Sequence, residues 1–437
     1  MEKEVLKSII VSHKEKFLSK SDLTDRAIIA KEQKKLLAKE VVFITGIRRS
    51  GKSSLLYLIY KYLSAIYQVP ARNILFINFE DERLINFGVD DFDALYRAFL
   101  EIENPEGKQY LFFDEIQNIN GWERWVNRLY EFEDTKVFIT GSNASLINSD
   151  ISTSLTGRNR QLQNFTFSFF EYAKLNQKEI TQRSLFSDSE KITINRLLSN
   201  YFNTGGFPEA LKVNDLDIVD QYFKDIIYRD IIAKYNIRNV KEIKELALYL
   251  ISNTGNINSY ENLKKIIGAT NVSTIKNYLS AFQDVFLIYA LPLFAYSVKK
   301  QIYNPNKYYA GDIGFYHAVG FSFSADKGRL LENLVLLDLL RNNHDVYYWK
   351  SKKGFEVDFV INKKKQIVTA IQVCYYLSNE NRDREVRALL AAANELDAQA
   401  LQIITYEQNE VIKTESKSVE VISYLHWLMK VYNKNQK

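Results

Sequence analysis

Residues 41–63 read VVFITGIRRSGKSSLLYLIYKYL, and this stretch decides the fold of the first part of the chain. Its first five residues are apolar or β-branched, as in a buried strand, and its last ten have the pattern of a helix. Between the two, Gly46, Gly51, Lys52 and Ser53 match the spacing G-x-x-x-x-G-K-[ST]. The strand before the motif and the helix after it are the context that the motif requires. We therefore expect a loop that binds the phosphates of a nucleoside triphosphate, rather than a chance glycine turn.

The residue types in this loop suit triphosphate binding. Glycines let backbone N–H groups approach phosphates closely, and the helix N-terminus adds the positive end of its dipole. We expect Lys52 to reach the β and γ phosphates and the Ser53 hydroxyl to ligate Mg²⁺. ATP and Mg²⁺ are therefore the expected cofactors. The expected binding loop contains Gly46, Arg49, Ser50, Gly51, Lys52, Ser53 and Ser54.

A later apolar run ends in two acidic residues, in the sequence YLFFDEIQ at residues 110–117. We expect Asp114 to hold the hydration shell of the metal ion and Glu115 to orient an attacking water molecule. Both carboxylates could instead be solvated charges at the end of a strand. The phosphate loop upstream favours the catalytic interpretation.

Apolar β-rich runs alternate with helical patterns between residues 41 and 169, which predicts a parallel sheet covered by helices. One run, at residues 74–79, lies between the phosphate loop and Asp114 along the chain. Its position predicts that a strand separates the strands of these two features in the sheet. This arrangement and the Asp-Glu pair resemble the AAA+ ATPases rather than the small GTPases.

Two further segments fit the AAA+ resemblance. The run at 137–140 continues as TGSNAS, which resembles the sensor segment of these ATPases, so Ser142 or Asn143 would contact the γ-phosphate or the water molecule. A polar turn is the alternative. Arg158 and Arg160 follow in SLTGRNRQ. An arginine supplied to the γ-phosphate of a neighbouring subunit would make hydrolysis depend on assembly, and we assign this role to Arg158; an ordinary surface arginine is the alternative.

The rest of the chain has a different pattern. Residues 175–250 are largely helical, interrupted at 204–211 by TGGFPEAL, where two glycines and a proline enforce a turn. Residues 253–293 suit a helix-turn-helix in which Ser259 caps the first helix and Ser273 caps the second. The mixed α/β region that follows is expected to contain one helix and two strands, at residues 327–341, 356–361 and 368–373.

The composition is that of a globular protein with two or three domains. The chain has 437 residues, of which 46% are hydrophobic and 25% charged, so disorder is not expected. Its net charge of +5 is compatible with a polyanionic partner but too small to indicate one. A single cysteine excludes an internal disulfide and suits a reducing cytoplasm. No apolar run approaches the roughly 20 residues that span a bilayer, so no membrane partner is expected.

The motifs together resemble a group of bacterial and archaeal AAA+-like ATP-binding proteins with a C-terminal domain of the PD-(D/E)XK nuclease type. The resemblance covers nearly the whole chain and is carried by GIRRSGKSSLL, FFDEIQNINGWERW, ITGSNASL, LTGR, GGFPEAL, the helix-turn-helix, GRLLENLV, GFEVDFVI and AIQV. It implies an α/β fold: a P-loop NTPase core with a parallel sheet, a helical lid, a winged-helix or helix-turn-helix segment, and a mixed α/β nuclease-like domain. The expected domains are residues 1–174, 175–250, 251–298 and 299–437.

A nuclease of this type gathers oxygen ligands on one or two Mg²⁺ ions and usually adds a lysine. The resemblance implies that Glu332, Asp358 and Gln372 are the metal ligands. The sequence departs from the pattern at the lysine, because Cys374 stands there and a thiol cannot supply a fixed positive charge.

Three interpretations of this domain stay open. It could bind nucleic acid without cutting it, act as a nuclease with a relocated base, or serve as a structural or protein-binding domain. The candidates for a relocated base are Lys350, Lys352 and Lys353.

The expected function is Mg²⁺-dependent hydrolysis of ATP coupled to binding or remodelling of DNA, with branched DNA as one candidate form. Basic and amide side chains on the helix-turn-helix suit phosphate contact, although such modules also brace ATPases internally. A homo-oligomer is expected, with a hexameric ring as one form. The alternatives are a signalling ATPase switch that acts on a protein partner and a nucleotide-binding scaffold with negligible turnover.

Overall fold

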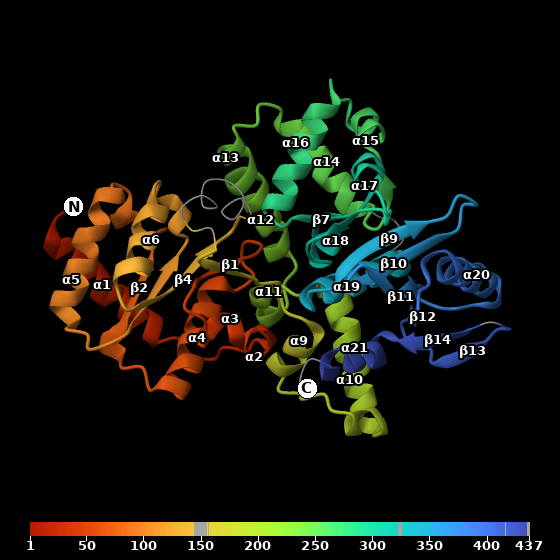
Figure 1. Cartoon of the computed structure of the whole chain (residues 1–437), viewed down its shortest axis with the longest axis horizontal. Coiled ribbons are helices and arrows are strands. Elements are labelled where there is room, and N and C mark those ends of the chain that lie inside the picture. Colours follow the sequence, from red (N-terminus) through yellow and green to blue (C-terminus); the bar gives the residue numbers. More distant parts are fainter. Residues whose placement is uncertain (144–154, 156, 322–325, 416, 435–437) are drawn as a thin grey trace. The chain divides into compact units, whose positions relative to one another are not determined.

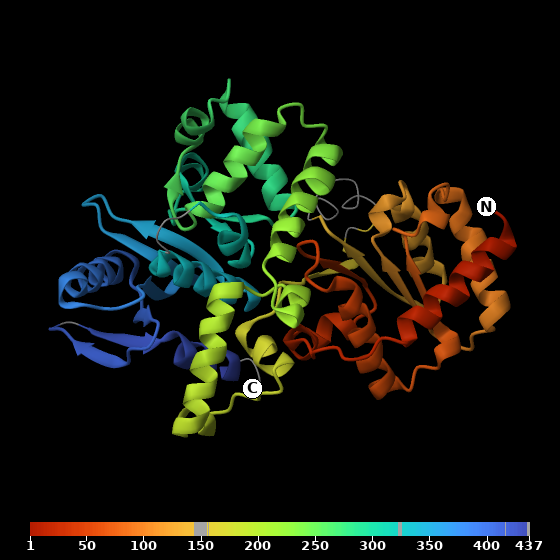
Figure 2. The same ribbon diagram turned by 180° about the vertical axis from the view of Figure 1, so that it is seen from behind.

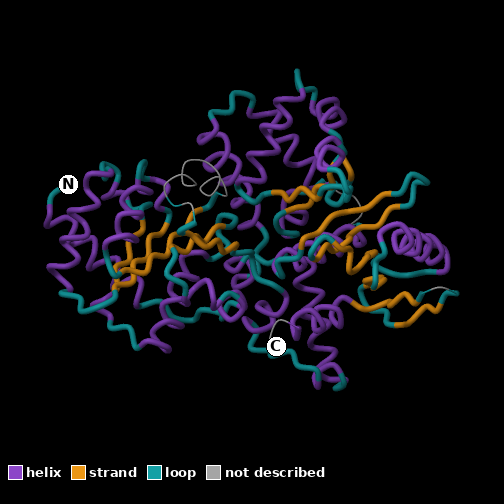
Figure 3. The backbone as a smooth tube through the Cα atoms, viewed as in Figure 1, coloured by secondary structure: helices purple, strands orange, loops and turns teal. Residues whose placement is uncertain are grey.

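The computed structural model describes residues 1–143, 155, 157–321, 326–415 and 417–434. The chain forms two compact units, Met1–Lys178 and Glu179–Lys437, drawn from opposite sides in Figures 1 and 2. Each unit has its own sheets, flanked by its own helices (Figure 3). The division of the second unit at residues 250 and 298 stays a proposal.

The sheet of the first unit has five parallel strands in the order β2-β3-β4-β1-β5. They are β1 Val41–Thr45, β2 Ile74–Asn78, β3 Gln109–Asp114, β4 Thr135–Gly141 and β5 Asn159–Gln163. The predicted parallel sheet is confirmed. A strand does separate β1 from β3, but it is β4. The run 74–79, which was expected there, forms β2 at the edge, because helical crossovers allow parallel strands to pair out of chain order.

Helices cover both faces of this sheet, since successive side chains of a strand point to opposite faces. Val41 and Phe43 pack in a core with α1, α5 and α6, whereas Val42 and Ile44 pack in a second core with α4. Among the described residues, the α-helices of this unit are α1 Lys3–Leu18, α2 Ala27–Lys31, α3 Gln33–Leu37, α4 Lys52–Tyr67, α5 Phe92–Glu103, α6 Trp122–Phe132 and α9 Phe169–Leu175. The buried sheet is a rigid platform for the loops that follow its strands.

The second unit contains two sheets. A three-stranded antiparallel sheet has the order β6-β8-β7, with β6 Ile257–Asn258, β7 Ile288–Leu291 and β8 Asn306–Ala310. A six-stranded mixed sheet has the order β13-β14-β12-β11-β10-β9. Its strands are β9 Asp345–Lys350, β10 Glu356–Lys363, β11 Gln366–Val373, β12 Ala400–Thr405, β13 Glu410–Lys413 and β14 Ser418–Ser423. The two strands predicted near residues 356 and 368 are β10 and β11.

Helices make up most of the remainder of this unit, as predicted for residues 175–250. They are α10 Asp188–Thr204, α11 Pro208–Val213, α12 Asp217–Asp225, the π-helix Ile226–Ile232, α13 Ala233–Tyr235, α14 Val240–Ser252, α15 Tyr260–Ile267, α16 Val272–Asp284, α17 Val298–Tyr303, α18 Gly314–Val319, α19 Lys327–Arg341, α20 Asn379–Leu396 and α21 Tyr424–Lys434. No helix in the described part of the chain is both long enough and apolar enough to cross a membrane.

The two helices α15 and α16 match the predicted helix-turn-helix, with one difference in capping. The Ser259 hydroxyl accepts from the Asn262 N–H at 3.1 Å and caps α15 as predicted. The predicted cap of α16 was wrong, because Asn271 Oδ1 accepts from the Thr274 N–H at 2.8 Å. Ser273 lies inside the helix, and its hydroxyl donates to the same Asn271 oxygen.

The turn in TGGFPEAL is held by a carboxylate from far along the chain. Gly205 has φ of 77°, and a Cβ atom there would lie 2.1 Å from Asp312 Oδ1. The N–H groups of Gly206 and Gly314 donate to the Asp312 carboxylate at 3.0 and 2.7 Å. The glycine is therefore required by a close approach as well as by its backbone conformation.

Candidate nucleotide site and carboxylate cluster

The phosphate loop begins where β1 ends and finishes at the start of α4. Gly46 has φ of 153°, and a Cβ atom there would lie 2.1 Å from the carbonyl oxygen of Asn164. The Asn164 N–H donates to the Thr45 carbonyl oxygen at 2.7 Å and so fixes this segment against the loop. Gly51, with φ of 87°, turns the chain into α4. The loop can pass its neighbour this closely only because residue 46 lacks a side chain.

Lys52 is the first residue of α4, and its side chain is 5% exposed. Its ammonium group donates to the carbonyl oxygens of Gly46 and Ile47 at 3.2 and 3.3 Å. Glu115 Oε1 lies 3.7 Å from the same nitrogen. The loop thus holds a positive charge beside a helix N-terminus, whose dipole also favours an anion.

Asp114 is the last residue of β3 and is buried. Thr140, on the neighbouring strand β4, donates its hydroxyl hydrogen to Asp114 Oδ1, and the Glu115 N–H donates to the Thr140 oxygen at 3.0 Å. Burial away from water and the nearby Glu115 carboxylate raise the pKa of Asp114, while hydrogen bonds from the Ser53 and Thr140 hydroxyls oppose the rise. Asp114 and Ser53 therefore lie side by side.

Glu115 follows β3 in a left-handed conformation, with φ of 54°. The Gln117 amide donates to Glu115 Oε2. This conformation costs about 1–3 kcal/mol for a residue other than glycine. It places the Glu115 carboxylate near Lys52 instead of continuing the strand.

The two residues predicted as sensors directly follow β4, which ends at Gly141. Ser142 and Asn143 are both buried. Because β4 pairs with β1 and β3 in parallel, its carboxyl end lies at the same sheet edge as the phosphate loop and Asp114. Residues 144–154 and 156, which belong to the same predicted segments, lie outside the described residues.

Arg158 lies at the amino ends of the strands, whereas the phosphate loop of the same subunit follows the carboxyl end of β1. It precedes β5, and its carbonyl oxygen accepts from the N–H of Val41, the first residue of β1. Its guanidinium group donates to Asn127 Oδ1 at 2.5 Å and forms an ion pair with Glu131 on α6. Arg158 therefore does not join the other predicted site residues within one chain.

A buried brace behind the phosphate loop was not predicted. Arg26 donates to the Ser50 carbonyl oxygen at 3.1 Å, to the Phe165 carbonyl oxygen at 2.7 Å and to Glu171 Oε1 at 2.9 Å. The Asn164 amide also donates to the Ser50 carbonyl oxygen, at 3.0 Å. Arg26 lies in a segment without a motif, and its partners are 24 to 145 residues away. Local sequence patterns therefore gave no signal for it.

ATP and Mg²⁺ fit the geometry of this site. Gly46 lets the loop backbone pass close to Asn164, Lys52 supplies a fixed charge, and the Ser53 hydroxyl and Asp114 carboxylate are oxygen ligands of the kind that Mg²⁺ prefers. Among the described residues, no group of three or more His, Cys, Asp or Glu side chains could hold a metal ion by itself. Phosphate and water oxygens would complete the Mg²⁺ shell, as is usual for this ion.

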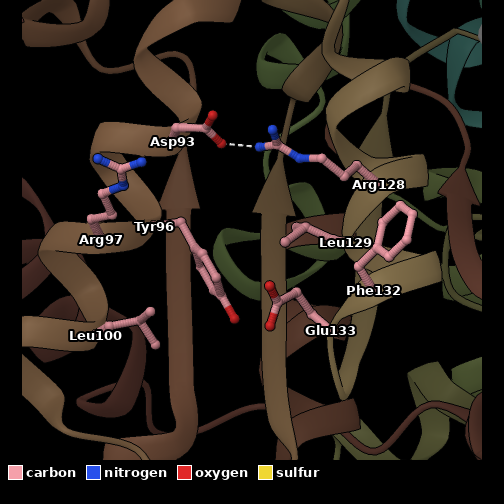
Figure 4. A pocket seen from close by; sticks show the side chains of 8 residues that line it. All are labelled: Asp93, Tyr96, Arg97, Leu100, Arg128, Leu129, Phe132 and Glu133. Carbon is pink, nitrogen blue, oxygen red and sulfur yellow. Dashed lines mark hydrogen bonds and ion pairs between the residues drawn. The ribbon is translucent and has the colours of Figure 1, made fainter.

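A pocket between α5 and α6 is separate from this site. Figure 4 shows Asp93 and Arg128 facing each other across it as an ion pair. Tyr96 donates to Gln109, the first residue of β3, so the pocket lies toward the amino ends of the strands. Its lining contains none of the predicted site residues: it consists of Asp93, Tyr96, Arg97, Leu100, Arg128, Leu129, Phe132 and Glu133.

In the second unit, the structure brings the three predicted nuclease-type residues together. Glu332 lies on α19, Asp358 on β10 and Gln372 on β11. Gln372 Oε1 accepts from the Asp358 N–H at 2.8 Å, and Asp358 Oδ2 accepts from the Val373 N–H at 2.9 Å. The Gln372 amide donates to Glu385 Oε2 at 2.6 Å. Gln372 Oε1 and Asp358 Oδ2 therefore already accept hydrogen bonds from backbone N–H groups of the sheet.

A lysine that the sequence did not indicate lies in the middle of these acids. The Lys307 ammonium group on β8 is 3.0 Å from Glu332 Oε1, 3.0 Å from Glu356 Oε1 and 2.8 Å from Asp358 Oδ1. We call these four residues the carboxylate cluster. A divalent metal ion does not fit among these three oxygens while the ammonium group is there.

The lysines proposed as a relocated base have other positions. Lys350 is half-exposed, with its nitrogen 3.9 Å from Glu356 Oε2, and Lys352 and Lys353 are exposed. Cys374, at the position of the motif lysine, is buried, and burial, followed by the charges of Glu385 and Asp358, raises the pKa of its thiol to about 12. Cys374 is therefore a neutral part of the apolar core.

Three family models match the chain. An AAA domain matches residues 38–173, and two domains of unknown function, DUF8612 and DUF4143, match residues 195–326 and 327–427. The AAA domain contains the phosphate loop, Asp114 and Glu115. The five-stranded core has the P-loop NTPase fold, and the second unit adds a separate mixed sheet.

Two solved structures of Aeropyrum pernix proteins are similar to this chain. The ORC1 protein in complex with DNA has 9% sequence identity and a TM-score of 0.31, with 75% of this chain and 97% of that chain covered. The ORC2 protein in its ADPNP-ADP complexes has 12% identity and a TM-score of 0.36, with 78% and 93% covered.

Two relatives align over nearly their whole length. An uncharacterized protein of Haemophilus influenzae is 28% identical over 419 residues, which cover 92% of this chain and 99% of that protein. An uncharacterized protein of Methanocaldococcus jannaschii is 35% identical over 439 residues, which cover 94% of this chain and 95% of that protein. The chain therefore belongs to the same family as this archaeal protein, and its residues 38–173 form an AAA domain.

Proposed function

We propose that the chain is a Mg²⁺-dependent ATPase whose nucleotide state controls its grip on DNA. The observation that carries the proposal is the meeting of Lys52, Ser53, Asp114 and Glu115 at one edge of the parallel sheet. A charge that neutralises phosphates, two oxygen ligands and a carboxylate for water are the parts that ATP hydrolysis needs.

In this mechanism the phosphate loop binds the triphosphate through its backbone N–H groups. The Lys52 ammonium group transfers its hydrogen bonds from the loop carbonyls to the phosphates. Ser53 and Asp114 would hold Mg²⁺, which would supply positive charge against the phosphates. Glu115 leaves the Gln117 amide and accepts a hydrogen bond from water, which it orients for attack. Ser142 and Asn143 contact the γ-phosphate side of the site.

We assign Arg158 to the site of a neighbouring subunit in a homo-oligomer, for which a hexameric ring is the proposed form. The support is its place at the sheet edge away from its own phosphate loop. Its side chain is 37% exposed, so a neighbour could reach it. Until then, its ion pair with Glu131 would hold the guanidinium group against α6.

DNA is the proposed partner, and the helix-turn-helix is the proposed contact. Lys264 and Lys265 occupy the last turn of α15, and Lys276 lies on α16 with its ammonium group 5.2 Å from the Tyr260 ring centre. Phosphate contacts by lysines would weaken as salt rises, because binding releases counterions. The carboxylate cluster would not cut this DNA.

A protein partner is the second candidate, and one surface favours it. The residues around α17 expose large apolar side chains: Tyr296 is 80% exposed, Ile302 67% and Tyr303 79%. Such side chains are common at interaction sites. In this case the ATPase would act as a signalling switch without processing nucleic acid.

The experiment that tests the proposal is an ATPase assay of the full chain with and without duplex, single-stranded and branched DNA. We expect Lys52→Ala to lose MgATP binding in calorimetry, and Glu115→Gln to bind MgATP but hydrolyse it at least about 100-fold more slowly. The matched control is Glu106→Gln, an exposed carboxylate paired with Arg72, which should retain full turnover.

The outcomes separate the candidates. Stimulation by DNA that decreases with salt supports the proposed partner. Indifference to every nucleic acid, with normal ATPase turnover, favours the signalling switch. Equal turnover of wild type and Glu115→Gln would contradict the ATPase mechanism and leave a nucleotide-binding scaffold.

A further inference from the structure

The Lys307 ammonium group has three N–H donors, and the carboxylate cluster supplies three acceptors. Glu332, Glu356 and Asp358 each place one oxygen within 3.0 Å of the nitrogen. These acids come from α19 and β10, whereas Lys307 comes from β8 of the three-stranded sheet. The ammonium group donates to Glu332 Oε1 and Asp358 Oδ1 and forms an ion pair with Glu356 Oε1, so all three acid groups share one cation.

The environment of the ammonium group is closed. The Lys307 side chain is 3% exposed, and the ring centre of Tyr348 lies 6.0 Å from its nitrogen. Tyr309, two residues further along β8, donates its hydroxyl hydrogen to Glu332 Oε1 at 2.6 Å. The same strand thus supplies both the cation and a second donor to the acids.

Converging carboxylates repel one another when buried, so each such group needs a cation or a proton. In metal-dependent nucleases a divalent cation fills this role. Here a cation from the chain itself lies at the point where the three acid groups meet. Because the sequence resemblance implies a metal ion at these acids, whereas an ammonium group lies among them, their pairing with Lys307 needs its own explanation.

We propose that Lys307 is the permanent cation of the carboxylate cluster: its ammonium group takes the place of a divalent metal ion, so the native cluster neither binds such an ion nor cleaves nucleic acid. The inference goes beyond the ATPase function and does not depend on it.

A relocated catalytic lysine is the competing interpretation. Such a lysine would need to face water or a scissile phosphate, but the Lys307 ammonium group is buried, donates to Glu332 and Asp358 and forms an ion pair with Glu356.

The test measures Mn²⁺ binding by calorimetry and by electron paramagnetic resonance, on the full chain without nucleotide. We expect Asp358→Asn to leave the Mn²⁺ affinity of the otherwise native chain unchanged. Lys307→Met keeps a long, unbranched side chain but removes the ammonium group, and should bind Mn²⁺ at least about tenfold more tightly than the native chain, because three carboxylates then lack a cation. Adding Asp358→Asn to Lys307→Met should abolish this gain.

Two controls keep the test decisive. Lys307→Arg retains a cation and should behave like the native chain. If Lys307→Met unfolds without metal, Mn²⁺ should restore its thermal transition in circular dichroism; failure of Mn²⁺ to bind or restore it would overturn the proposal. A loss of native Mn²⁺ binding on Asp358→Asn, or DNA cleavage abolished by that change, would also overturn it, whatever the ATPase assay shows.

Discussion

Gly46 is the residue of the phosphate loop whose substitution has the clearest steric result. A Cβ atom at this position would meet the Asn164 carbonyl oxygen at 2.1 Å, and backbone atoms cannot move aside as a flexible side chain can. We expect Gly46→Ala to destabilise the first unit by about 1–3 kcal/mol and to weaken MgATP binding, because the loop must open. Thermal unfolding and calorimetry measure the two effects.

Gly107 provides the matched control. It also has positive φ, 71°, but a Cβ atom there would meet nothing within 4 Å. Gly107→Ala should cost about 1 kcal/mol and leave MgATP affinity unchanged. Equal effects of the two substitutions on affinity would contradict the steric argument.

Lys136, the second residue of β4, gives the first unit a predicted pH dependence. Burial, and then repulsion from Lys108, lowers the pKa of Lys136 from 10.5 to about 7. Between these values the unfolded chain binds more protons than the folded chain, so stability increases with pH. We expect the free energy of unfolding in urea to increase from pH 7 to about 9, and Lys136→Met to remove the increase. Lys61→Met, at an exposed position, should keep it; a flat native profile would contradict the prediction.

The residues that sequence could identify are those whose partners are close in the chain or follow a fixed spacing. Lys52 and Ser53 belong to one loop, and Asp114 ends a recognisable strand. Arg26 and Lys307 could not be identified in this way. Each acts through contacts that form only when segments distant in the sequence pack together.

At the scale of elements, apolar runs located four of the five strands of the first sheet, and β5 was missed. Its sequence, NRQLQ, has one apolar residue, and its burial pattern is mostly intermediate or exposed because it lies at the sheet edge. An edge strand such as β5 pairs with one neighbouring strand and is largely exposed, so its sequence lacks the hydrophobic pattern from which strands are predicted. The predicted position of the run 74–79 in the sheet was wrong for a different reason. Helical connections between parallel strands leave the order of the strands undetermined by the sequence.

The segments that hold the phosphate loop are joined by the ion pair between Arg26 and Glu171. Both side chains are at most 7% exposed, and Glu171 also caps α9. Removing one member of a buried pair leaves an uncompensated charge, so Arg26→Met should destabilise the first unit by about 3–5 kcal/mol. Because Arg26 also bonds the Ser50 carbonyl oxygen, MgATP affinity should fall as well.

The exposed pair of Arg72 and Glu106 is the control for this prediction. Arg72→Met should cost less than about 1 kcal/mol, since water screens exposed ion pairs. Urea unfolding of both variants gives the comparison. A similar small cost for both would show that Arg26 does not brace the loop.

For the whole molecule, the proposed oligomer makes a prediction about mixtures. Arg158→Ala should lower ATP turnover about 10³-fold although MgATP still binds, because the γ-phosphate of the neighbouring subunit loses its arginine. Mixing this variant with Lys52→Ala should restore part of the turnover, since some interfaces then combine an intact loop with an intact arginine.

Arg128→Ala is the control, because Arg128 is likewise an exposed, ion-paired arginine of the first unit. It should retain turnover. Turnover by Arg158→Ala equal to the native value, independent of protein concentration, would remove the role of Arg158 in a neighbouring site.

The ion pairs of Lys307 with the three acids also affect how the second unit unfolds. The three-stranded sheet supplies the Lys307 ammonium group, and the six-stranded sheet supplies two of the carboxylates that pair with it. If one sheet unfolded alone, the other would keep charged groups without their partners. The two sheets should thus lose their amide hydrogen-exchange protection together, as one cooperative block, and the backbone bridge between Leu293, just after β7, and Tyr348 on β9 would add to this coupling.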